Sequence, residues 1–328
     1  MSSKSRPQGL FDASRTLVNE VVSVRNGEIV LLISDLPVRW ELVQAVLNEV
    51  ISVGGHPYLL SFNVTSDNED IPLCASQLID AAQVLILITN KSLSFSSQVL
   101  DSLRSGKRVA SCPRTDEDMF CRALSVKPSE LARETSIVAS VINNASTVEV
   151  LSGGGALKAT ISGRKTLYVD GLANAPGKFT IIPGGIIGIA PLEGSVHGEV
   201  LVNGSITGLG MVSSHVHLTV ESGEVTEISG GDDARKLIKL LDSYRSADMY
   251  KVCEIGIGVH PLMRVRGNPT EDESARGVVV VGLGENTHLG GKIAAPSHVD
   301  LTIVGATMKV NSGRTIVNKG ELRLMPHE

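Results

Sequence analysis

Aromatic side chains are scarce in this sequence: they make up 3% of its 328 residues, against 42% for all hydrophobic residues. Proteins that bind single-stranded nucleic acid stack bases on aromatic rings and carry clusters of basic residues. The formal net charge of -5, with both signs interspersed, gives no electrostatic surface for nucleic acid or an anionic membrane. We therefore expect a small-molecule substrate as partner, and neither nucleic acid nor membrane.

Cysteines and long apolar runs are also few. The four cysteines show no CxxC spacing, which argues against a disulfide framework and against a cysteine zinc site. No apolar run approaches the roughly 20 residues of a membrane span, and the first residues have no apolar segment typical of a secretion signal. These absences favour a cytoplasmic location.

Three common catalytic and nucleotide-binding motifs are missing. The first predicted strand is not followed by GxGxxG, and GxxxxGK[ST] occurs nowhere, so no motif supports binding of a dinucleotide or nucleotide. GxSxG is absent too, which argues against a nucleophilic serine at a strand-to-helix turn.

The first part of the chain alternates apolar strand signals with amphipathic helix signals. This alternation predicts an α/β domain over residues 1–145, with a doubly wound parallel sheet of the Rossmann or flavodoxin type. A helix over residues 129–144 is expected to lead out of it. The expected strands are 28–35, 57–62, 83–89 and 108–112, and the expected helices are 40–53, 72–82 and 96–105.

The second part has a different pattern. Short strands separated by glycines run from residue 147 to 225, and one helix, 232–246, is expected after them. We therefore expect a second domain over residues 146–328, rich in mixed or antiparallel β-structure. A chain of this length suits two domains of roughly 150 residues each.

His298 and Asp300 carry the first chemical signal. They lie two residues apart in a strand-like run, so their side chains point to the same face of the strand. An imidazole and a carboxylate in this arrangement are typical ligands of Fe(II), Mn(II) or Zn(II). We therefore predict a site for one divalent metal ion.

Two glycine-rich segments before this pair strengthen the prediction. Glu254 lies among apolar residues and glycines, where an unpaired carboxylate is costly, so it is expected to be paired, protonated or bound to a cation. Residues 282–291 contain four glycines directly after an apolar strand, which allows the backbone to approach a ligand closely. The three segments are predicted to form the walls of one cleft.

These segments resemble a known superfamily. The stretches EIGIGVHP, GVVVVGLGENTHLGG and SHVDLTI, with PGGIIGIAPLEGSVHGEVLVNGSI before them, are similar to the metal-site half of the aminopeptidase T family of leucyl aminopeptidases. They are also similar to the 2,5-dihydroxypyridine 5,6-dioxygenases, mononuclear Fe(II) enzymes that share the fold. The resemblance in order and spacing covers about residues 180–318 and implies a symmetric homo-oligomer, a dimer or larger.

The two groups differ in the ligands that the resemblance implies. For the two-metal aminopeptidase site the corresponding positions are Ile186, Glu254, Val280, a residue near Thr287, His298 and Asp300. Ile186 replaces a Glu and Val280 replaces a His, so we expect one ion and not two. The dioxygenases hold iron with two His and one Asp beside a Ser, where this chain has Glu254 in place of a His and Gly282 in place of the Ser.

The ligand set of Glu254, His298 and Asp300 favours hydrolysis as the leading hypothesis. It is harder than a set of two His and one carboxylate, which shifts preference toward Mn(II) or Zn(II), with Fe(II) still possible. We therefore expect a metal-dependent hydrolase, aminopeptidase-like or amidase-like, that opens a C–N bond with metal-activated water. One alternative is a ring-cleaving Fe(II) dioxygenase of a hydroxylated N-heterocycle. Another is a family member that binds a small molecule without turning it over.

Further residues are assigned secondary roles. His288 in the glycine loop and Glu193 in a turn are expected to handle protons, and His288 is alternatively a fourth ligand. The arginines of the run after Glu254 are expected to meet an anionic group of the substrate. The predicted substrate contacts are His260, Arg264, Arg266, Gly282 and Asn286.

Overall fold

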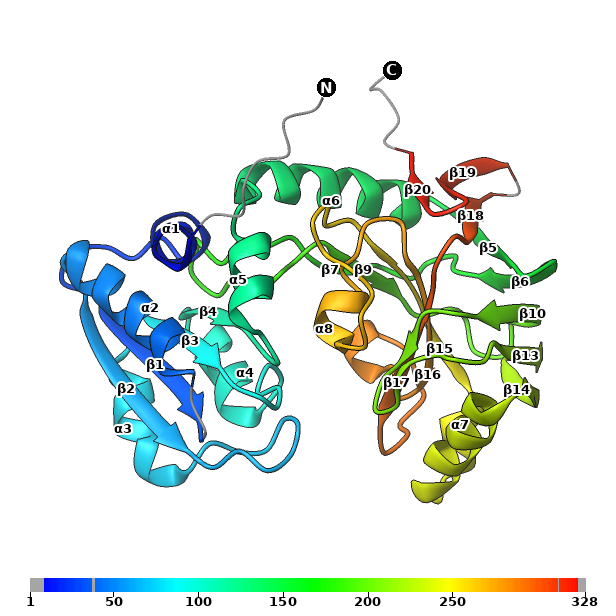
Figure 1. Ribbon diagram of the computed structural model, residues 1–328, viewed down its shortest axis with the longest axis horizontal. Helices are drawn as coiled ribbons and strands as arrows, with labels where there is room; N and C mark the ends of the chain where they lie inside the picture. The colour runs from blue at the N-terminus through cyan, green and yellow to red at the C-terminus, as the bar shows by residue number, and fades with distance from the viewer. Residues whose placement is uncertain (1–8, 37–38, 312, 324–328) are drawn as a thin grey trace. The chain divides into compact units, whose positions relative to one another are not determined.

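The computed structural model describes residues 9–36, 39–311 and 313–323 (Figure 1). The chain divides into two compact units. The first runs to Ala132 and takes in Val169–Gly184, and the second comprises Arg133–Tyr168 and the chain from Gly185 onward. The segment Val169–Gly184, expected in the second domain, therefore belongs to the first unit, because its strand extends the first unit's sheet.

The first unit is built on a five-stranded parallel sheet of order β2-β1-β3-β4-β8. The four expected strands of this region are confirmed. The fifth, β8, pairs with β4 and comes from the segment 169–184. The strands are β1 (Ile29–Asp35), β2 (His56–Phe62), β3 (Val84–Ile88), β4 (Arg108–Ser111) and β8 (Phe179–Ile181).

Helices between these strands cover the sheet. On one face, alternate strand residues such as Leu31 and Ile33 form one buried cluster with Ile79 and Val99 of two helices. The period of two follows from the alternation of side chains along a strand. The helices of the unit are α1 (Leu10–Thr16), α2 (Trp40–Ser52), α3 (Ser76–Ala81), α4 (Ser97–Arg104) and α5 (Glu117–Ala123).

The second unit contains two mainly antiparallel sheets that share one apolar core. The larger has the order β14-β13-β10-β6-β5-β18-β19-β20, and the smaller β12-β11-β17-β16-β15-β9-β7. Inward-facing residues of both sheets, among them Val150, Leu218, Ile255 and Leu301, belong to a single buried cluster. The predicted α/β class is therefore confirmed as a parallel sheet combined with antiparallel sheets.

The strands of the larger sheet, in chain order, are β5 (Thr147–Ser152), β6 (Gly155–Thr160), β10 (His197–Val202), β13 (Val216–Glu221), β14 (Glu224–Gly230), β18 (Thr307–Val310), β19 (Arg314–Asn318) and β20 (Glu321–Leu322). Those of the smaller sheet are β7 (Leu167–Val169), β9 (Ile186–Ile189), β11 (Ser205–Ile206), β12 (Gly210–Met211), β15 (Val252–Gly258), β16 (Val279–Gly284) and β17 (His298–Ile303).

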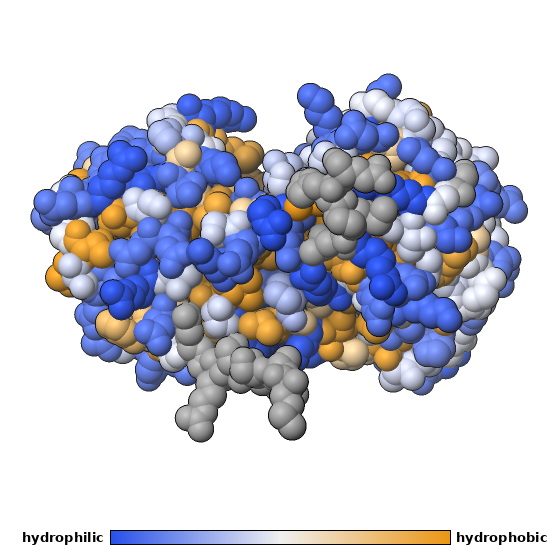
Figure 2. All heavy atoms as spheres, turned by 90° about the horizontal axis from the view of Figure 1, so that it is seen from above, coloured by the Kyte–Doolittle hydropathy of each residue, from blue (hydrophilic) through white to orange (hydrophobic). Residues whose placement is uncertain are grey.

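Helices are few after the first unit. The expected helix 129–144 is α6 (Pro128–Asn143), and the expected helix 232–246 is α7 (Asp232–Ser243). A further short helix, α8 (Pro269–Asp272), was not expected; it places Glu271 and Asp272 among buried residues. None of the helices in the described residues is long and apolar enough to span a bilayer. Hydrophilic and apolar residues are interspersed on the visible surface (Figure 2).

Candidate metal centre

Three neighbouring strands of the smaller sheet bring the predicted ligands together. Strands β15, β16 and β17 lie side by side (Figure 1). Val299 and Leu301 point into the core, so His298 and Asp300 project from the opposite face of β17. In the ladder, Gly282 of β16 pairs with Glu254 on one side and with Asp300 on the other. The carboxylates therefore flank a residue that has no side chain.

The side chains of these residues converge on one point. The Nε2 atom of His298 lies 2.9 Å from Oδ1 of Asp300 and 3.2 Å from Oε2 of Glu254. Their side chains are mostly buried, with exposed fractions of 18%, 15% and 11% for His298, Asp300 and Glu254. One imidazole nitrogen and two carboxylates in this arrangement fit a divalent cation in charge and in ligand type.

Glycines make the space that the Glu254 side chain occupies. A Cβ atom at Gly188 of β9 would lie 2.1 Å from Oε1 of Glu254, and one at Gly256 would lie 3.0 Å from the same oxygen. A Cβ at Gly282 would lie 2.8 Å from Cβ of Glu254 and 2.9 Å from Nε2 of His298. The glycines of these three strands are therefore required for a carboxylate at position 254, and Gly282, predicted as a substrate contact, keeps the space between the ligands open.

A hydrogen bond fixes the orientation of the His298 ring. Its Nδ1 atom lies 2.6 Å from the main-chain carbonyl oxygen of Glu285, and the Cys253 thiol is 3.5 Å from the same nitrogen. A carbonyl oxygen only accepts, so Nδ1 carries the proton and Nε2 faces the carboxylates. This is the usual arrangement of a metal-binding histidine.

The charges around His298 favour positive charge at this site. Burial by itself lowers the pKa of His298, but the Asp300 carboxylate and the Cys253 side chain together raise it well above its ordinary value. Burial tends to raise the pKa of Asp300, yet the positive charge and hydrogen bond of His298 hold that pKa below its usual range. The Asp300 carboxylate therefore stabilises positive charge on His298, as expected of a group that binds a cation.

His288 reaches the same point from the loop after β16. It lies in the 3₁₀ turn Thr287–Leu289, and its ring packs edge-on against that of His298 with 5.3 Å between the ring centres. One potential ligand atom from each of Glu254, His288 and His298 lies within 4.8 Å of the others. The structure therefore places His288 beside the predicted ligands, in reach as a fourth ligand or as a proton-transfer group.

Glu273 was not predicted and belongs to this group. Burial, followed by the negative charges of Asp300 and Glu254, raises the pKa of Glu273 well above its usual range, and its carboxyl hydrogen-bonds to Asp300. A protonated Glu273 thus donates to Asp300 and helps to hold it. In the sequence it stands in a run of three acidic residues before an apolar strand, where a solvated turn is the simplest interpretation.

The other predicted proton-transfer group, Glu193, is engaged elsewhere. Its Oε2 pairs with Arg164 at 2.5 Å, and its Oε1 accepts a hydrogen bond from the main-chain NH of Lys292. Arg164 also donates to the carbonyl of Gly290, at the end of the His288 turn. These contacts support the loop that carries His288, and the role of Glu193 as a base stays a prediction.

Two of the expected substrate contacts are buried. His260 and Asn286 have no exposed surface, and their role as substrate contacts stays a prediction. The amide of Asn286 donates to the carbonyl of Cys253 and accepts from the main-chain NH of Ile293, so it ties the His288 loop to β15. Asn286 is buried because the backbone groups of a loop without regular structure need side chains as hydrogen-bond partners.

The two arginines differ in their surroundings. The Nε of Arg266 pairs with the fully buried carboxylate of Glu271. Arg264 is exposed, and its main-chain NH donates to the same Glu271 carboxylate. Arg266 therefore stabilises the loop through α8, which the sequence did not indicate, and both arginines are exposed to solvent.

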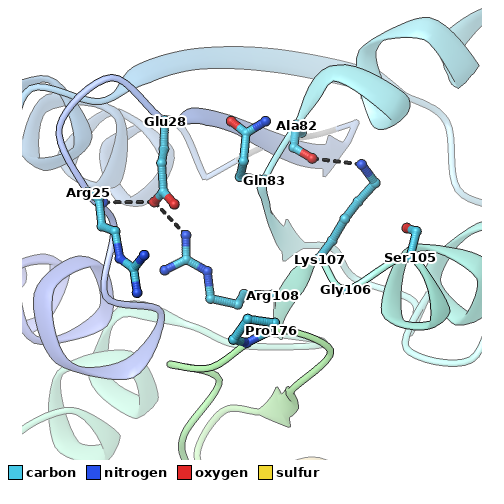
Figure 3. Close-up of a pocket in the computed structure, with 9 residues that line it drawn as sticks. All are labelled: Arg25, Glu28, Ala82, Gln83, Ser105, Gly106, Lys107, Arg108 and Pro176. Atoms are coloured by element: carbon cyan, nitrogen blue, oxygen red, sulfur yellow. Dashed lines mark hydrogen bonds and ion pairs between the residues drawn. The ribbon is translucent and has the colours of Figure 1, made fainter.

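A separate pocket of about 310 Å³ lies in the first unit (Figure 3). Its Lys107 donates to the carbonyls of Asp80 and Ala82, and its Arg108 pairs with Glu28 and donates to main-chain carbonyls. Since these cations already bind protein oxygens, the pocket gives no support for a second reaction site.

Comparisons with known proteins identify the family. The family model for 2,5-dihydroxypyridine 5,6-dioxygenase matches residues 16–324. The chain belongs to this dioxygenase family. A curated relative, 2,5-dihydroxypyridine 5,6-dioxygenase of Pseudomonas putida, is 24% identical over 268 residues, which cover 76% of this chain and 74% of the relative.

Solved structures show the same fold. The 2,5-dihydroxypyridine dioxygenase from Pseudomonas putida KT2440 has a TM-score of 0.82 at 18% identity, covering 95% of this chain and 96% of its own. AmpT from Thermus thermophilus has a TM-score of 0.72 at 10% identity, covering 96% and 99%. The resemblance to both groups is thus confirmed. The comparisons support the dioxygenase alternative better than the hydrolase that was the leading hypothesis.

Proposed function

We propose that this protein is a mononuclear Fe(II) dioxygenase that opens the ring of a small hydroxylated N-heterocycle. The observation that carries the proposal is the convergence of His298, Asp300 and Glu254 over Gly282, in a chain that matches the dioxygenase family over residues 16–324. The curated relative is named for the same kind of ring cleavage, which supports this substrate class.

His298 Nε2 and the carboxylates of Asp300 and Glu254 would hold the ion. A bound Fe(II) supplies the redox and Lewis-acid chemistry that joins both atoms of O₂ to the ring as a ring bond breaks. Glu254 stands where the sequence resemblance implies a histidine, so this set carries one more negative charge than two His and one Asp. The extra charge strengthens attraction for a divalent cation and lowers the reduction potential of an iron bound there.

We propose that His288 takes the proton of a ring hydroxyl. Its side chain is 31% exposed, more than those of the three predicted ligands, so a substrate can approach it. Its Nδ1 faces the Glu285 carboxylate, so we propose Nε2 as the proton acceptor. Arg264 stays the candidate for an anionic group of the substrate, and the expected homo-oligomer stays a prediction.

Oxygen consumption tests the proposal. Protein loaded anaerobically with Fe(II) is mixed with 2,5-dihydroxypyridine and O₂, and uptake is followed beside the loss of the aromatic absorption. We expect about one O₂ per ring opened, with activity lost in His298→Ala and kept in His217→Ala, which alters an exposed histidine of β13. Turnover of the heterocycle without oxygen uptake would reject the proposal.

A hydrolase is the second candidate, favoured by one observation. Glu254 makes the ligand set harder than two His and one carboxylate, and such sets serve metal-activated water well. Amide hydrolysis by the Zn(II) or Mn(II) protein under anaerobic conditions would support this candidate.

A further inference from the structure

One residue contacts both imidazoles of the site. The side-chain Oε2 of Glu285 lies 2.6 Å from Nδ1 of His288, and its main-chain carbonyl oxygen lies 2.6 Å from Nδ1 of His298. Glu285 was not singled out in the sequence, where it is one polar residue in a glycine-rich loop.

The local structure holds Glu285 in this position. It follows β16 directly, and its main-chain NH donates to the carbonyl of Ser297, the residue before His298. Its other carboxylate oxygen, Oε1, accepts hydrogen bonds from the main-chain NH and the hydroxyl of Thr287. Because Oε1 is occupied in this way, Oε2 is the oxygen left for His288.

Both contacts act on the tautomer of a ring. An oxygen that accepts from Nδ1 fixes the proton there, so the lone pair of a neutral ring stays on Nε2. The partner of the second ring nitrogen sets how an active-site histidine is oriented. In both histidines the orientation is therefore fixed from the side away from the cluster.

We propose that Glu285 is the positioning residue of this site, which orients His298 through its main-chain carbonyl and His288 through its carboxylate. The predicted effect on turnover rests on the proposed function. The predicted effect on the orientation and tautomer of the two histidine rings does not. Substitution of the side chain removes the contact to His288 and keeps the carbonyl that holds His298. The two histidines should therefore respond differently to the same substitution.

The test is nuclear magnetic resonance of metal-free protein with ¹⁵N-labelled histidine, in the wild type, Glu285→Ala and Glu285→Gln. The chain has eight histidines, few enough to assign by single substitutions. In the wild type we expect an Nδ1–H signal from His288, shifted by its hydrogen bond to the Glu285 carboxylate. In Glu285→Ala we expect His288 to populate both tautomers, while the Nδ1–H signal of His298 stays in place.

Turnover gives the second readout. With Fe(II) bound, we expect kcat of Glu285→Ala to fall about 100-fold, the size of a lost general-base contribution, with KM and iron content changed less than about threefold. The kcat of Glu285→Gln, which keeps the side-chain size, should fall less than that of Glu285→Ala. Glu69→Ala is the matched control, because Glu69 of the first unit also accepts from the NH and hydroxyl of a threonine, Thr65.

The outcomes separate this proposal from the proposed function. A His288 tautomer that is unchanged in Glu285→Ala overturns the positioning role, as does loss of the His298 Nδ1–H signal in that variant. If the wild type opens no ring, the proposed function fails, yet the tautomers of metal-free protein still decide whether Glu285 positions His288. Unfolding of Glu285→Ala is detected by circular dichroism, and Glu285→Gln then provides the comparison.

Discussion

Gly282 faces Glu254 across the β15–β16 ladder so closely that a methyl group on Gly282 would lie 2.8 Å from Cβ of Glu254. The same methyl group would lie 2.9 Å from Nε2 of His298. The glycine at position 282 and the glutamate at position 254 are therefore linked: in this backbone, the space above β16 holds the ligand side chains only if residue 282 has none.

Gly282→Ala is predicted to displace Glu254 or His298 and to weaken metal binding by about tenfold or more. Overpacking of this kind typically costs about 1–3 kcal/mol of stability. Metal affinity by titration calorimetry and the midpoint of thermal unfolding check both effects. Gly313→Ala is the control, because nothing lies within 4 Å of a Cβ there. If the Gly282→Ala protein binds metal as tightly as the wild type, a Cβ at position 282 does not crowd Glu254 and His298.

Removal of a predicted ligand should remove the metal. We expect His298→Ala and Glu254→Gln, purified without chelators, to hold less than about a tenth of the metal of the wild type, because each loses one of few ligand groups. Elemental analysis measures this directly. Equal metal content in both variants and the wild type would show that the ion binds elsewhere.

The raised pKa of His298 predicts a pH dependence. A metal takes the lone pair of Nε2, so a proton there must leave first. Since Asp300 raises the pKa of His298 despite burial, metal affinity should keep increasing with pH above about 6.5, the ordinary value for histidine. Titrations in buffers of different ionisation enthalpy should also show proton release. An affinity that is constant between pH 7 and 9 would contradict this.

The stability of the metal-free protein should fall as pH rises, whereas metal affinity should increase. A folded-state pKa above the unfolded value means that the charged His298 stabilises the fold fully below the unfolded pKa. That contribution is lost as pH rises through the folded pKa. Thermal unfolding of metal-free protein over this pH range measures the loss, and Asp300→Asn, which removes the charge that raises the pKa, should flatten the curve.

The two arginines near α8 should separate stability from function. Breaking a buried ion pair costs about 3–5 kcal/mol, and since the Arg266 side chain is 35% exposed, we expect about 2 kcal/mol for Arg266→Ala. Arg264→Ala should change stability by less than about 0.5 kcal/mol, as is usual at the surface, and should raise KM if Arg264 contacts the substrate. Denaturant unfolding and steady-state kinetics compare the two variants.

Sequence patterns predicted the elements that local rules determine. Buried strands of the first unit, the long helix α6 and the shared face of His298 and Asp300 all follow from periodicity, which requires no knowledge of distant contacts. Strand β8 did not follow, because a three-residue strand is too short for a pattern and its place beside β4 depends on the chain returning to the first unit.

The centre itself was predictable only in part. Glu254 was expected to need a partner because of its apolar surroundings, and the structure supplies His298. Glu273 and Glu285 were missed because their roles come from contacts between loops and strands far apart in the chain. For Asn286 and Arg266, both predicted as substrate contacts, the sequence did not indicate the protein groups that they bind.

The most direct measurement is isotope labelling of the ring-opened product under ¹⁸O₂. With Fe(II)-loaded protein and 2,5-dihydroxypyridine, a dioxygenase places both atoms of one ¹⁸O₂ molecule in the product, and mass spectrometry should show a gain of about 4 mass units. A product that takes its new oxygen from H₂¹⁸O and forms equally well without O₂ would contradict the account and show that this metal centre serves hydrolysis.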